Sequence, residues 1–233
     1  GILGETQDGT HCEFIAVSES NICSKPNHLS FEEAAAFPLT AQTAYSMLIR
    51  RAKIQPGETV FVWGAGSGVG IMAIEIAKVK GCQIITTGGS EEKRTHAKSI
   101  GADLVLDHYN DNVVDKVKEF TAGKGVDVVF EHVGEATWET SMKILGKGGR
   151  LVTCGATTGP KVNIDVRHLF IKQQTFMGST MGDLAAFDDC LSLVADGKIK
   201  PVIDRSFPFS AIRDAHDHLE NGNQIGKVIL LPE

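Results

Sequence analysis

The chain has 233 residues, of which 42% are hydrophobic and 22% are charged, and its 23 basic and 29 acidic side chains give a net charge of −6. This composition excludes two classes of protein, because a disordered chain has fewer apolar residues and a membrane span needs about 18 consecutive apolar residues, a run that this sequence lacks. The acidic balance, without a stripe of lysine or arginine, also predicts neither a nucleic-acid partner nor a membrane partner.

The first 37 residues carry two local signals. The segment Glu13–Val17 predicts a single β-strand. Farther along, Ser30 and Glu33 have the spacing of a capping box, in which each side chain satisfies a backbone amide at the start of a helix. These elements lack a regular rhythm of strands and helices, so they predict one part of a flanking domain.

The middle of the chain alternates between buried strands and helices. Short apolar segments bounded by glycine, proline or polar clusters predict strands at Thr59–Trp63, Gln83–Thr87, Leu104–Asp107, Val126–Phe130, Arg150–Thr153 and Thr175–Gly178. A helix is clearest in the apolar stripe of Val69, Met72, Ala73, Ile76 and Ala77. The alternation predicts an α/β fold with a doubly wound parallel Rossmann sheet of about six strands.

Three further helices are predicted outside this stripe. Asp111 is the expected cap of a helix that continues through Val113, Val117 and Phe120. A later helix is marked by Leu184, Phe187, Leu191 and Val194. Near the end, strands over Lys200–Phe207 and Lys227–Leu230 flank a helix that begins near Ser210. The two ends of the chain together are too short for a complete second domain.

A glycine-rich turn directly follows the first buried strand. The segment Gly64–Gly70 (GAGSGVG) leads from this strand into the amphipathic helix. Such a turn exposes unpaired N–H groups and the positive end of the helix dipole, and residues without a Cβ let a diphosphate approach the backbone. The strict GxGxxG spacing is not met, because Val69 or Ile71 occupies the third glycine place. The turn predicts nucleotide binding; the alternative is a tight turn that needs glycine only for its geometry.

The end of the second strand indicates which nucleotide would bind. An NAD site has a carboxylate there, about 20 residues beyond the turn, that accepts from the ribose 2′-OH. This chain has Thr87–Gly89 instead, followed by Ser90, whose hydroxyl can donate, and by Lys93 and Arg94, which can reach a 2′-phosphate. The pattern favours NADPH over NADH. Glu91 and Glu92, which lie between Ser90 and Lys93, suit the N-terminus of any helix because they oppose its dipole. The alternative is therefore a solvated helix face that binds no phosphate.

With these residues, the sequence resembles the medium-chain dehydrogenase/reductase superfamily, in the branch of quinone oxidoreductases and zinc-type alcohol dehydrogenases. The resemblance runs the whole length and is carried by Asp8–Phe14 (DGTHCEF), Pro38–Tyr45 (PLTAQTAY), Ala65–Gly70 (AGSGVG) and Gly226–Val228 (GKV). It implies the end of a GroES-like substrate domain at 1–37, a Rossmann coenzyme domain at 38–180, and a return to the substrate domain at 181–233. It also implies a homodimer through the edge strand at 175–179.

The resemblance further implies which residues would contact the coenzyme. They are Thr43, Gly66, Ser67, Gly68, Val69, Ser90, Lys93, His108, Val133, Gly155, Ala156 and Ser179. Thr43 and the 66–69 backbone would lie along the coenzyme, and Ser90, Lys93 and His108 would surround the adenosine phosphate. Residues after the fourth and fifth strands would flank the riboses, and Ser179 would approach the nicotinamide. The family often has tyrosine at the place of His108.

Metal and thiol chemistry are not predicted. Neither zinc site of the family can be built from these residues, so zinc is not supported as a cofactor and no metal ligand is assigned. His216 and His218 are two apart on an expected helix and point to nearly opposite sides, which predicts a polar helix face. The five cysteines are an odd number without a CxxC pair and predict free thiols in a reducing, cytoplasmic compartment.

The combined prediction is an enzyme, an NADPH-dependent oxidoreductase acting on a small molecule. It would transfer hydride between the nicotinamide and a carbonyl, alcohol, quinone or enone. No catalytic acid or base is identified, and we expect the chain to be a piece of a longer protein that is incomplete for catalysis. The alternatives are a non-catalytic NADPH-binding module and an S-adenosylmethionine-dependent methyltransferase, although the second would need an acid at the tip of the second strand.

Overall fold

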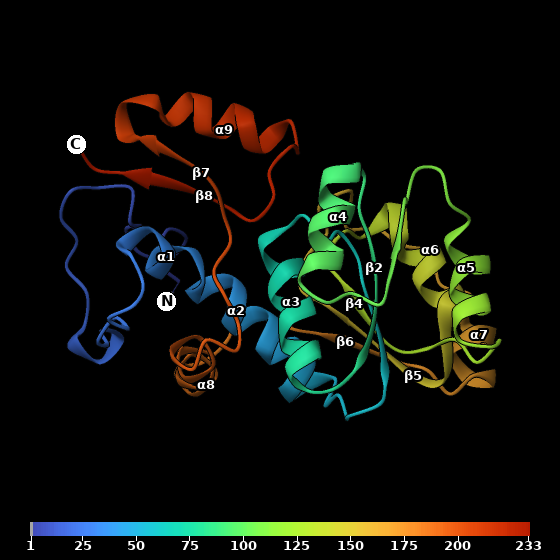
Figure 1. The fold of residues 1–233 in the computed structure, drawn as a ribbon. Coiled ribbons are helices and arrows are strands. Elements are labelled where there is room, and N and C mark those ends of the chain that lie inside the picture. Colours follow the sequence, from blue (N-terminus) through green and yellow to red (C-terminus); the bar gives the residue numbers. More distant parts are fainter. Residues whose placement is uncertain (1) are drawn as a thin grey trace. The chain divides into compact units, whose positions relative to one another are not determined.

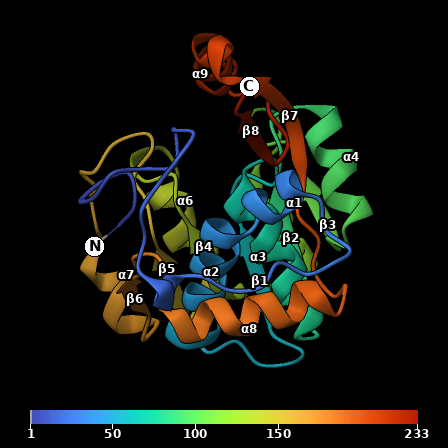
Figure 2. The ribbon, with the colours of Figure 1, turned by 90° about the vertical axis from the view of Figure 1, so that its left-hand side faces the viewer.

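The computed structural model describes residues 2–233, which form two compact units. Unit 1 combines the segment up to Phe37 with Pro201–Glu233, and unit 2 spans Pro38–Lys200. The boundary expected after residue 180 falls instead after Lys200, because helix α8 (Leu184–Ala195) packs against helix α2 (Pro38–Tyr45) of unit 2 (Figure 2).

Unit 2 is built on a six-stranded parallel sheet. Its strands are β1 (Thr59–Val62), β2 (Gln83–Thr87), β3 (Leu104–Leu106), β4 (Val126–Glu131), β5 (Leu145–Thr153) and β6 (Thr175–Gly178). They are arranged in the order β3-β2-β1-β4-β5-β6, and every neighbouring pair is parallel. The six predicted strands are confirmed, with β5 beginning at Leu145 rather than at Arg150. The order reverses between β2 and β4 on either side of β1, as in a doubly wound sheet.

Helices cover both faces of this sheet. Helices α3 (Gly68–Val79) and α4 (Glu91–Ser99) lie on one side, and α5 (Val113–Phe120) and α6 (Glu135–Ile144) lie on the other (Figure 1). The predicted stripe of α3 is buried from Met72 to Ala77, because it packs on the sheet. On the opposite face, Val113 and Val117 of α5 join Phe61 and Leu151 in one core cluster. The predicted Rossmann fold is therefore confirmed.

Three more elements complete unit 2. The chain continues from α2 through a π-helical segment, Ser46–Arg51, and α7 (Val166–Ile171) precedes β6. The predicted helix marked by Leu184 and Val194 is confirmed as α8.

The start of α5 differs from the prediction. Asn112 is the N-cap, and its side chain accepts from the backbone N–H of Asp115 at 3.3 Å. The carboxylate of Asp111 accepts instead from the backbone N–H of Asp107 at 2.7 Å. Asp111 therefore closes the turn that follows β3, and the prediction that it caps the helix is wrong.

Unit 1 is small and is made of both ends of the chain. It contains the 3-10 segments Glu19–Asn21 and Phe209–Ala211 together with α1 (Phe31–Ala36), β7 (Ile203–Pro208), α9 (Ile212–Glu220) and β8 (Lys227–Leu231). Strands β7 and β8 pair in parallel, and α1 contacts both of them. The terminal strands and the helix between them are therefore confirmed.

The two signals predicted before residue 38 have different outcomes. The capping box is confirmed, since the backbone N–H of Ser30 donates to Glu33 and the backbone N–H of Glu33 donates to Ser30. The strand predicted at Glu13–Val17 is wrong. Among the described residues no strand pairs with this segment, and its Phe14 side chain is 90% exposed.

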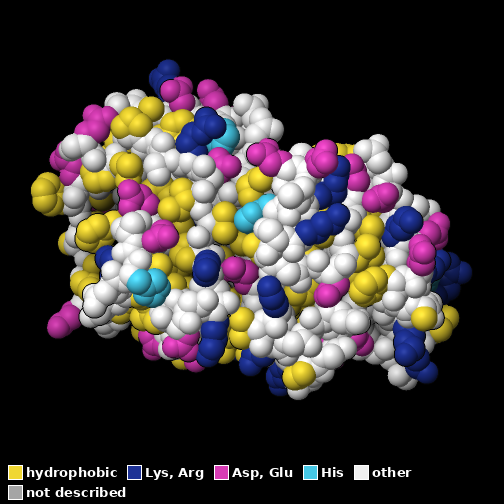
Figure 3. All heavy atoms as spheres, in the orientation of Figure 1, with side chains coloured by type: hydrophobic (Ala, Val, Ile, Leu, Met, Phe, Trp, Pro, Cys, Tyr) yellow, Lys and Arg dark blue, Asp and Glu magenta, His cyan; other side chains and the backbone are white. Residues whose placement is uncertain are grey.

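Two surface properties bear on partners. None of the helices formed by residues 2–233 has the length and apolar character that a membrane crossing requires. Basic and acidic side chains are interspersed over the face of the molecule shown in Figure 3. Neither observation assigns a partner.

Candidate functional site

The predicted site residues follow the carboxyl ends of the strands of unit 2. Gly66 follows β1, Ser90 follows β2, His108 follows β3, Val133 follows β4 and Gly155 follows β5. Parallel strands bring their carboxyl ends to one edge of a sheet, and ligands of open α/β sheets bind there, where the strand order reverses. In this chain that place is between β2, β1 and β4.

The turn after β1 is fixed by Ser67 and by two glycines. The hydroxyl of Ser67 donates to the carbonyl of Gly64 at 2.9 Å and accepts from the backbone N–H of Gly70 at 3.0 Å, so Ser67 caps α3. A Cβ on Gly70 would lie 2.4 Å from the Gly64 carbonyl oxygen. The turn therefore packs so closely on the helix that no side chain fits at position 70.

The same turn presents backbone amides at the start of α3. The N–H groups of Gly66, Gly68 and Val69 have no acceptor within residues 38–200. These amides lie at the positive end of the helix dipole, an arrangement that binds phosphate groups. The turn thus offers three backbone N–H groups at the start of α3.

Lys93 lies over the glycine turn, and His108 lies at the tip of β2. A Cβ on Gly66 would lie 2.7 Å from Cδ of Lys93, so the stem of this lysine passes over the glycine turn. A Cβ on Gly89 would lie 2.9 Å from Nε2 of His108, so the imidazole lies at the tip of β2. Burial is the main cause that lowers the pKa of His108; the charge of Asp107 partly opposes this effect, and the charges of Lys93 and Arg94 add to it. His108 is accordingly a neutral hydrogen-bonding group near neutral pH.

Arg94 is engaged elsewhere. Its Nη1 donates to Asp107 at 2.8 Å and to the carbonyl of Gly88 at 3.0 Å, and the side chains of the ion pair are 25% and 17% exposed. Hydrogen bonds from the Asn110 side chain and the Tyr109 backbone, together with Arg94, lower the pKa of Asp107. Because the ionised carboxylate holds Arg94, the hypothesis that Arg94 reaches a 2′-phosphate is not supported.

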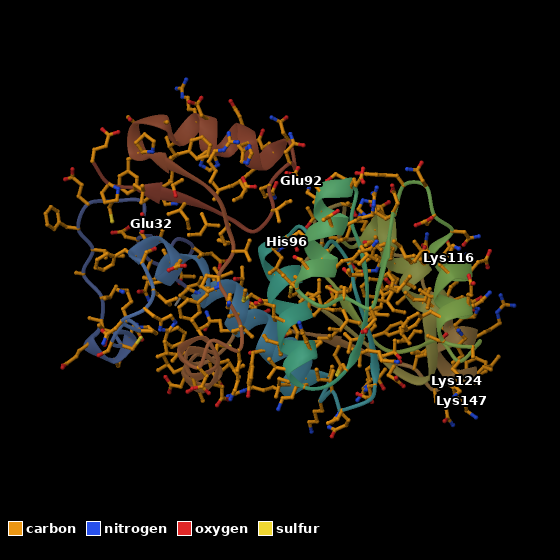
Figure 4. All side chains as sticks on the ribbon, viewed as in Figure 1. Glu32, Glu92, His96, Lys116, Lys124 and Lys147 are labelled. Carbon is orange, nitrogen blue, oxygen red and sulfur yellow. The ribbon has the colours of Figure 1, made fainter. Side chains whose placement is uncertain are left out.

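Other groups of α4 add little positive charge at the crevice. Ser90 is the N-cap, and its hydroxyl oxygen accepts from the backbone N–H of Lys93 at 3.3 Å. Glu92 and His96, one turn apart, project from the same side of the helix (Figure 4). Burial lowers the pKa of His96, which keeps its imidazole neutral at pH 7. Lys93 is therefore the cation that α4 brings to the glycine turn.

The turns after β4 and β5 pack against each other. The backbone N–H of Thr158 donates to the carbonyl of Val133 at 2.8 Å. A Cβ on Gly155 would lie 2.9 Å from the carbonyl oxygen of His132, and a Cβ on Gly134 would lie 3.0 Å from Cα of Ala156. The structure thus brings Val133, Gly155 and Ala156 together, as the resemblance implies.

His132 connects this region to the glycine turn. Its Nε2 lies 3.0 Å from the carbonyl oxygen of Trp63 and 3.4 Å from the hydroxyl of Ser67, which fits donation from the ring nitrogen to the carbonyl. Burial lowers the pKa of His132, so the ring is neutral. The imidazole acts here as a structural link between the ends of β1 and β4.

A cavity of about 520 Å³ opens beside the glycine turn. Its lining is mostly apolar, with polar groups from Asp111, Asn112 and the threonines, and consists of Trp63, Gly64, His108, Tyr109, Asp111, Asn112, Val113, Val114, Val133, Ala136, Thr137, Thr140 and Thr158. Such a cavity suits a flat, partly apolar ring of the size of a purine. Trp63, Tyr109 and the threonines of this lining were not predicted from the sequence. Of these residues, only Trp63 could have been found from the sequence, because it lies at the carboxyl end of a predicted strand.

Two predicted residues lie away from this cavity. The hydroxyl of Thr43 donates to the carbonyl of Leu39 at 2.7 Å within α2, and the side chain is buried. Ser179 donates its backbone N–H to the carbonyl of Thr153 and lines a second cavity, of about 530 Å³, with Arg50 and Arg51. Neither Thr43 nor Ser179 lines the cavity that His108 and Val133 line.

Groups capable of metal or thiol chemistry are dispersed. Within residues 2–233 no group of three or more His, Cys, Asp or Glu side chains is placed to hold a metal ion. His218 is bound instead to Asp204, with Nε2 and Oδ2 2.6 Å apart. The cysteines are free thiols, and burial raises the pKa of Cys154, next to the β5 turn, to about 11.

Comparison with known proteins places this site in a family. The family model described as zinc-binding dehydrogenase matches residues 68–196. The quinone oxidoreductase of Homo sapiens is 30% identical over 233 residues, which cover 97% of this chain and 70% of that protein. The crotonyl-CoA carboxylase/reductase of Cereibacter sphaeroides is 32% identical, with 97% of this chain and 59% of that protein covered. The chain thus spans less than two thirds of this second relative.

Solved structures of similar proteins support the same family. A crystal structure of an NAD-dependent alcohol dehydrogenase matches with a TM-score of 0.95 at 40% identity, over 99% of this chain and 67% of that chain. A 2-octenoyl-CoA carboxylase reductase, solved in complex with NADP and 2-octenoyl-CoA, matches with a TM-score of 0.84 at 30% identity, over 90% of this chain and 52% of that chain. This chain therefore belongs to the medium-chain dehydrogenase/reductase superfamily, a superfamily of oxidoreductases, and to its zinc-binding dehydrogenase family.

Proposed function

We propose that this chain is the coenzyme-binding part of an NADPH-dependent oxidoreductase that acts on a small carbonyl, alcohol, quinone or enone substrate. One observation carries the proposal: the amides at the start of α3 lie beside a strand tip, at Thr87–Gly89, that has no carboxylate but has Lys93 across the turn. This combination fits a diphosphate next to a ribose that carries a 2′-phosphate.

Each group of the site has a role in this proposal. The amides of Gly66, Gly68 and Val69 hold the diphosphate, and Ser90 and Lys93 hold the 2′-phosphate. The cavity lined by Trp63 and Val133 takes the adenine ring. The glycines that admit no Cβ let the turns and Lys93 pack closely around this site. When bound, NADPH supplies hydride from C4 of its nicotinamide, and the residues of this chain orient it.

The proposed preference for NADPH over NADH rests on the residues of this chain and not on the coenzymes of its relatives. One similar structure contains NADP, and another similar protein is named as NAD-dependent. The zinc that gives the family its name does not fit the described residues, which offer no cluster of ligands. We therefore assign this chain no step through a metal.

Among the alternatives, the methyltransferase is contradicted by membership of an oxidoreductase family. The non-catalytic module differs from the proposal only in the absence of turnover. Hydride transfer from NADPH to a panel of aldehydes, quinones and enoyl thioesters, measured with the full-length protein, separates the two. The free thiols agree with the reducing, cytoplasmic location that we propose.

Replacing Lys93 with glutamine tests the coenzyme assignment. Loss of the ammonium group removes one charge-assisted hydrogen bond to the 2′-phosphate, which contributes about 1.5–3 kcal/mol. The Kd for NADPH should therefore rise about tenfold or more, while the Kd for NADH changes little. Calorimetric titration measures both constants, and Lys98→Gln near the other end of α4 is the control. Equal losses for NADPH and NADH would argue against a 2′-phosphate contact.

We also propose that two copies associate through β6 and the adjacent helix α7. Strand β6 is the last strand of the sheet, and α7 exposes Val166, Phe170 and Ile171 by 61–65%. An open strand edge next to an apolar helix favours pairing with a second copy. We expect a dimer in analytical ultracentrifugation and a monomer for Phe170→Asp. Phe120→Asp on α5, which is also partly exposed, should remain a dimer; a monomeric unsubstituted chain would refute the proposal.

A further inference from the structure

Glu131 is a buried carboxyl group that forms no ion pair with any side chain of residues 2–233. It is the last residue of β4 and is 0% exposed. Its Oε1 accepts from three successive backbone N–H groups, those of His132, Val133 and Gly134, at 2.9, 2.7 and 3.2 Å. A buried polar group needs hydrogen-bond partners, and here the backbone of the next turn supplies them. The carboxylate therefore sets the path of the chain from β4 into α6.

The second oxygen of Glu131 reaches the helix that follows. Oε2 accepts from the hydroxyls of Thr137 and Ser141 of α6, both at 2.8 Å. The hydroxyl of Ser141 in turn accepts from Nε1 of Trp63 at 2.8 Å, and Ser141 is fully buried. Because a serine hydroxyl has one hydrogen, donation to Glu131 orients its lone pairs toward the indole N–H. A continuous chain of hydrogen bonds thus runs from β4 to the residue that precedes the glycine turn.

This chain of bonds joins two walls of one cavity. Trp63 lines the cavity of about 520 Å³ from the β1 side, and Val133 and Thr137 line it from the β4 side. The ring of His132 adds a second link, through the carbonyl of Trp63. Neither Glu131 nor Ser141 lines the cavity itself. Glu131 and Ser141 therefore act on a ligand only through the walls that they hold.

We propose that Glu131 and Ser141 are positioning residues for the adenosine half of the coenzyme. The inference rests on the proposed NADPH site and adds the device that shapes its adenine cavity. Hydrogen bonds between charged and neutral groups in a dry interior are strong and directional, so they hold Trp63 and the β4 turn at a fixed separation. The adenine ring then enters a cavity that is already formed, which lowers the cost of binding.

The test separates the two halves of the coenzyme. Calorimetry on the 233-residue chain compares NADPH with 2′-phospho-ADP-ribose, which has the adenosine half and lacks the nicotinamide. For Ser141→Ala we expect Kd to rise by the same factor, about tenfold, for both ligands. Ser192→Ala, which removes a helix hydroxyl that donates to Asp188 on α8, should change neither. Circular dichroism confirms that the variants are folded at the temperature of the titration.

A second readout follows Trp63 directly. The chain has two tryptophans, so a Trp138→Phe background leaves Trp63 as the only one. Its emission should shift in Ser141→Ala and should not shift in Ser192→Ala. Should Ser141→Ala fail to fold, Ser141→Cys keeps a side chain of similar shape, replaces the hydroxyl with a weak thiol donor, and should again weaken both ligands equally.

The outcomes are distinct. Unchanged affinities, or a loss for NADPH that the fragment does not share, overturn the positioning role. If the unsubstituted chain binds neither NADPH nor 2′-phospho-ADP-ribose, the proposed function itself fails.

Discussion

Replacing Gly70 with alanine should raise the Kd for NADPH about 100-fold, which corresponds to about 2.7 kcal/mol. The added Cβ would lie 2.4 Å from the carbonyl oxygen of Gly64 and 2.8 Å from the hydroxyl of Ser67. Both neighbours are fixed, since one is backbone and the other caps α3. The turn must open by roughly 1 Å, and a misplacement of that size costs about 100-fold where several groups must align.

Titration by fluorescence or calorimetry measures this effect, and the position offers a matched control. Gly178→Ala adds the same methyl group in β6, where nothing lies within 4 Å of the new Cβ. That variant should bind NADPH like the unsubstituted chain. Retained affinity in Gly70→Ala would mean that the glycine turn does not hold the diphosphate.

Replacing Glu131 with alanine should lower the free energy of unfolding by about 3–5 kcal/mol. The substitution leaves three backbone N–H groups and the hydroxyl of Ser141 without their acceptor in a site that solvent does not reach, whereas the hydroxyl of Thr137 keeps the carbonyl of Gly134 as an acceptor at 3.2 Å. Each buried donor that loses its partner costs about 1–3 kcal/mol, and water that enters the vacated space recovers a part. Urea unfolding followed by circular dichroism measures the change.

Glu135→Ala provides the comparison for this prediction. Glu135 lies in the first turn of α6, is exposed, and contributes mainly by opposing the helix dipole, which is worth about 0.3–1 kcal/mol. A loss for Glu131→Ala no larger than the loss for Glu135→Ala would show that the turn after β4 keeps its structure without the carboxylate.

The Rossmann sheet could be predicted because its signals are local. Each strand of unit 2 is a short apolar run between turn residues, and the stripe from Val69 to Ala77 has the period of a helix. The segment Glu13–Val17 has a similar local pattern but forms no strand, since a strand also needs a partner to pair with. Asn112 and Asp111 are adjacent residues that can both cap a helix, so composition alone did not decide between them.

The candidate site was predictable where it depends on backbone shape. The glycine turn and the strand tip without a carboxylate are visible in the sequence, and the structure places them side by side. The ion pair of Arg94 with Asp107 was not predictable, because it joins α4 to the turn after β3. The same holds for Trp63, whose partner Ser141 is 78 residues away. Long-range contacts of this kind decide which polar groups remain available to a ligand.

The two-part construction of unit 1 has a consequence for biosynthesis. Helix α1 near the beginning contacts β7 and β8 near the end, and all of unit 2 lies between them in the chain. A ribosome therefore releases the complete Rossmann sheet before the partners of α1 exist. Until β8 emerges, α1 lacks the contacts that it makes with β7 and β8 in the folded chain, and a pause in translation after Lys200 would prolong that interval.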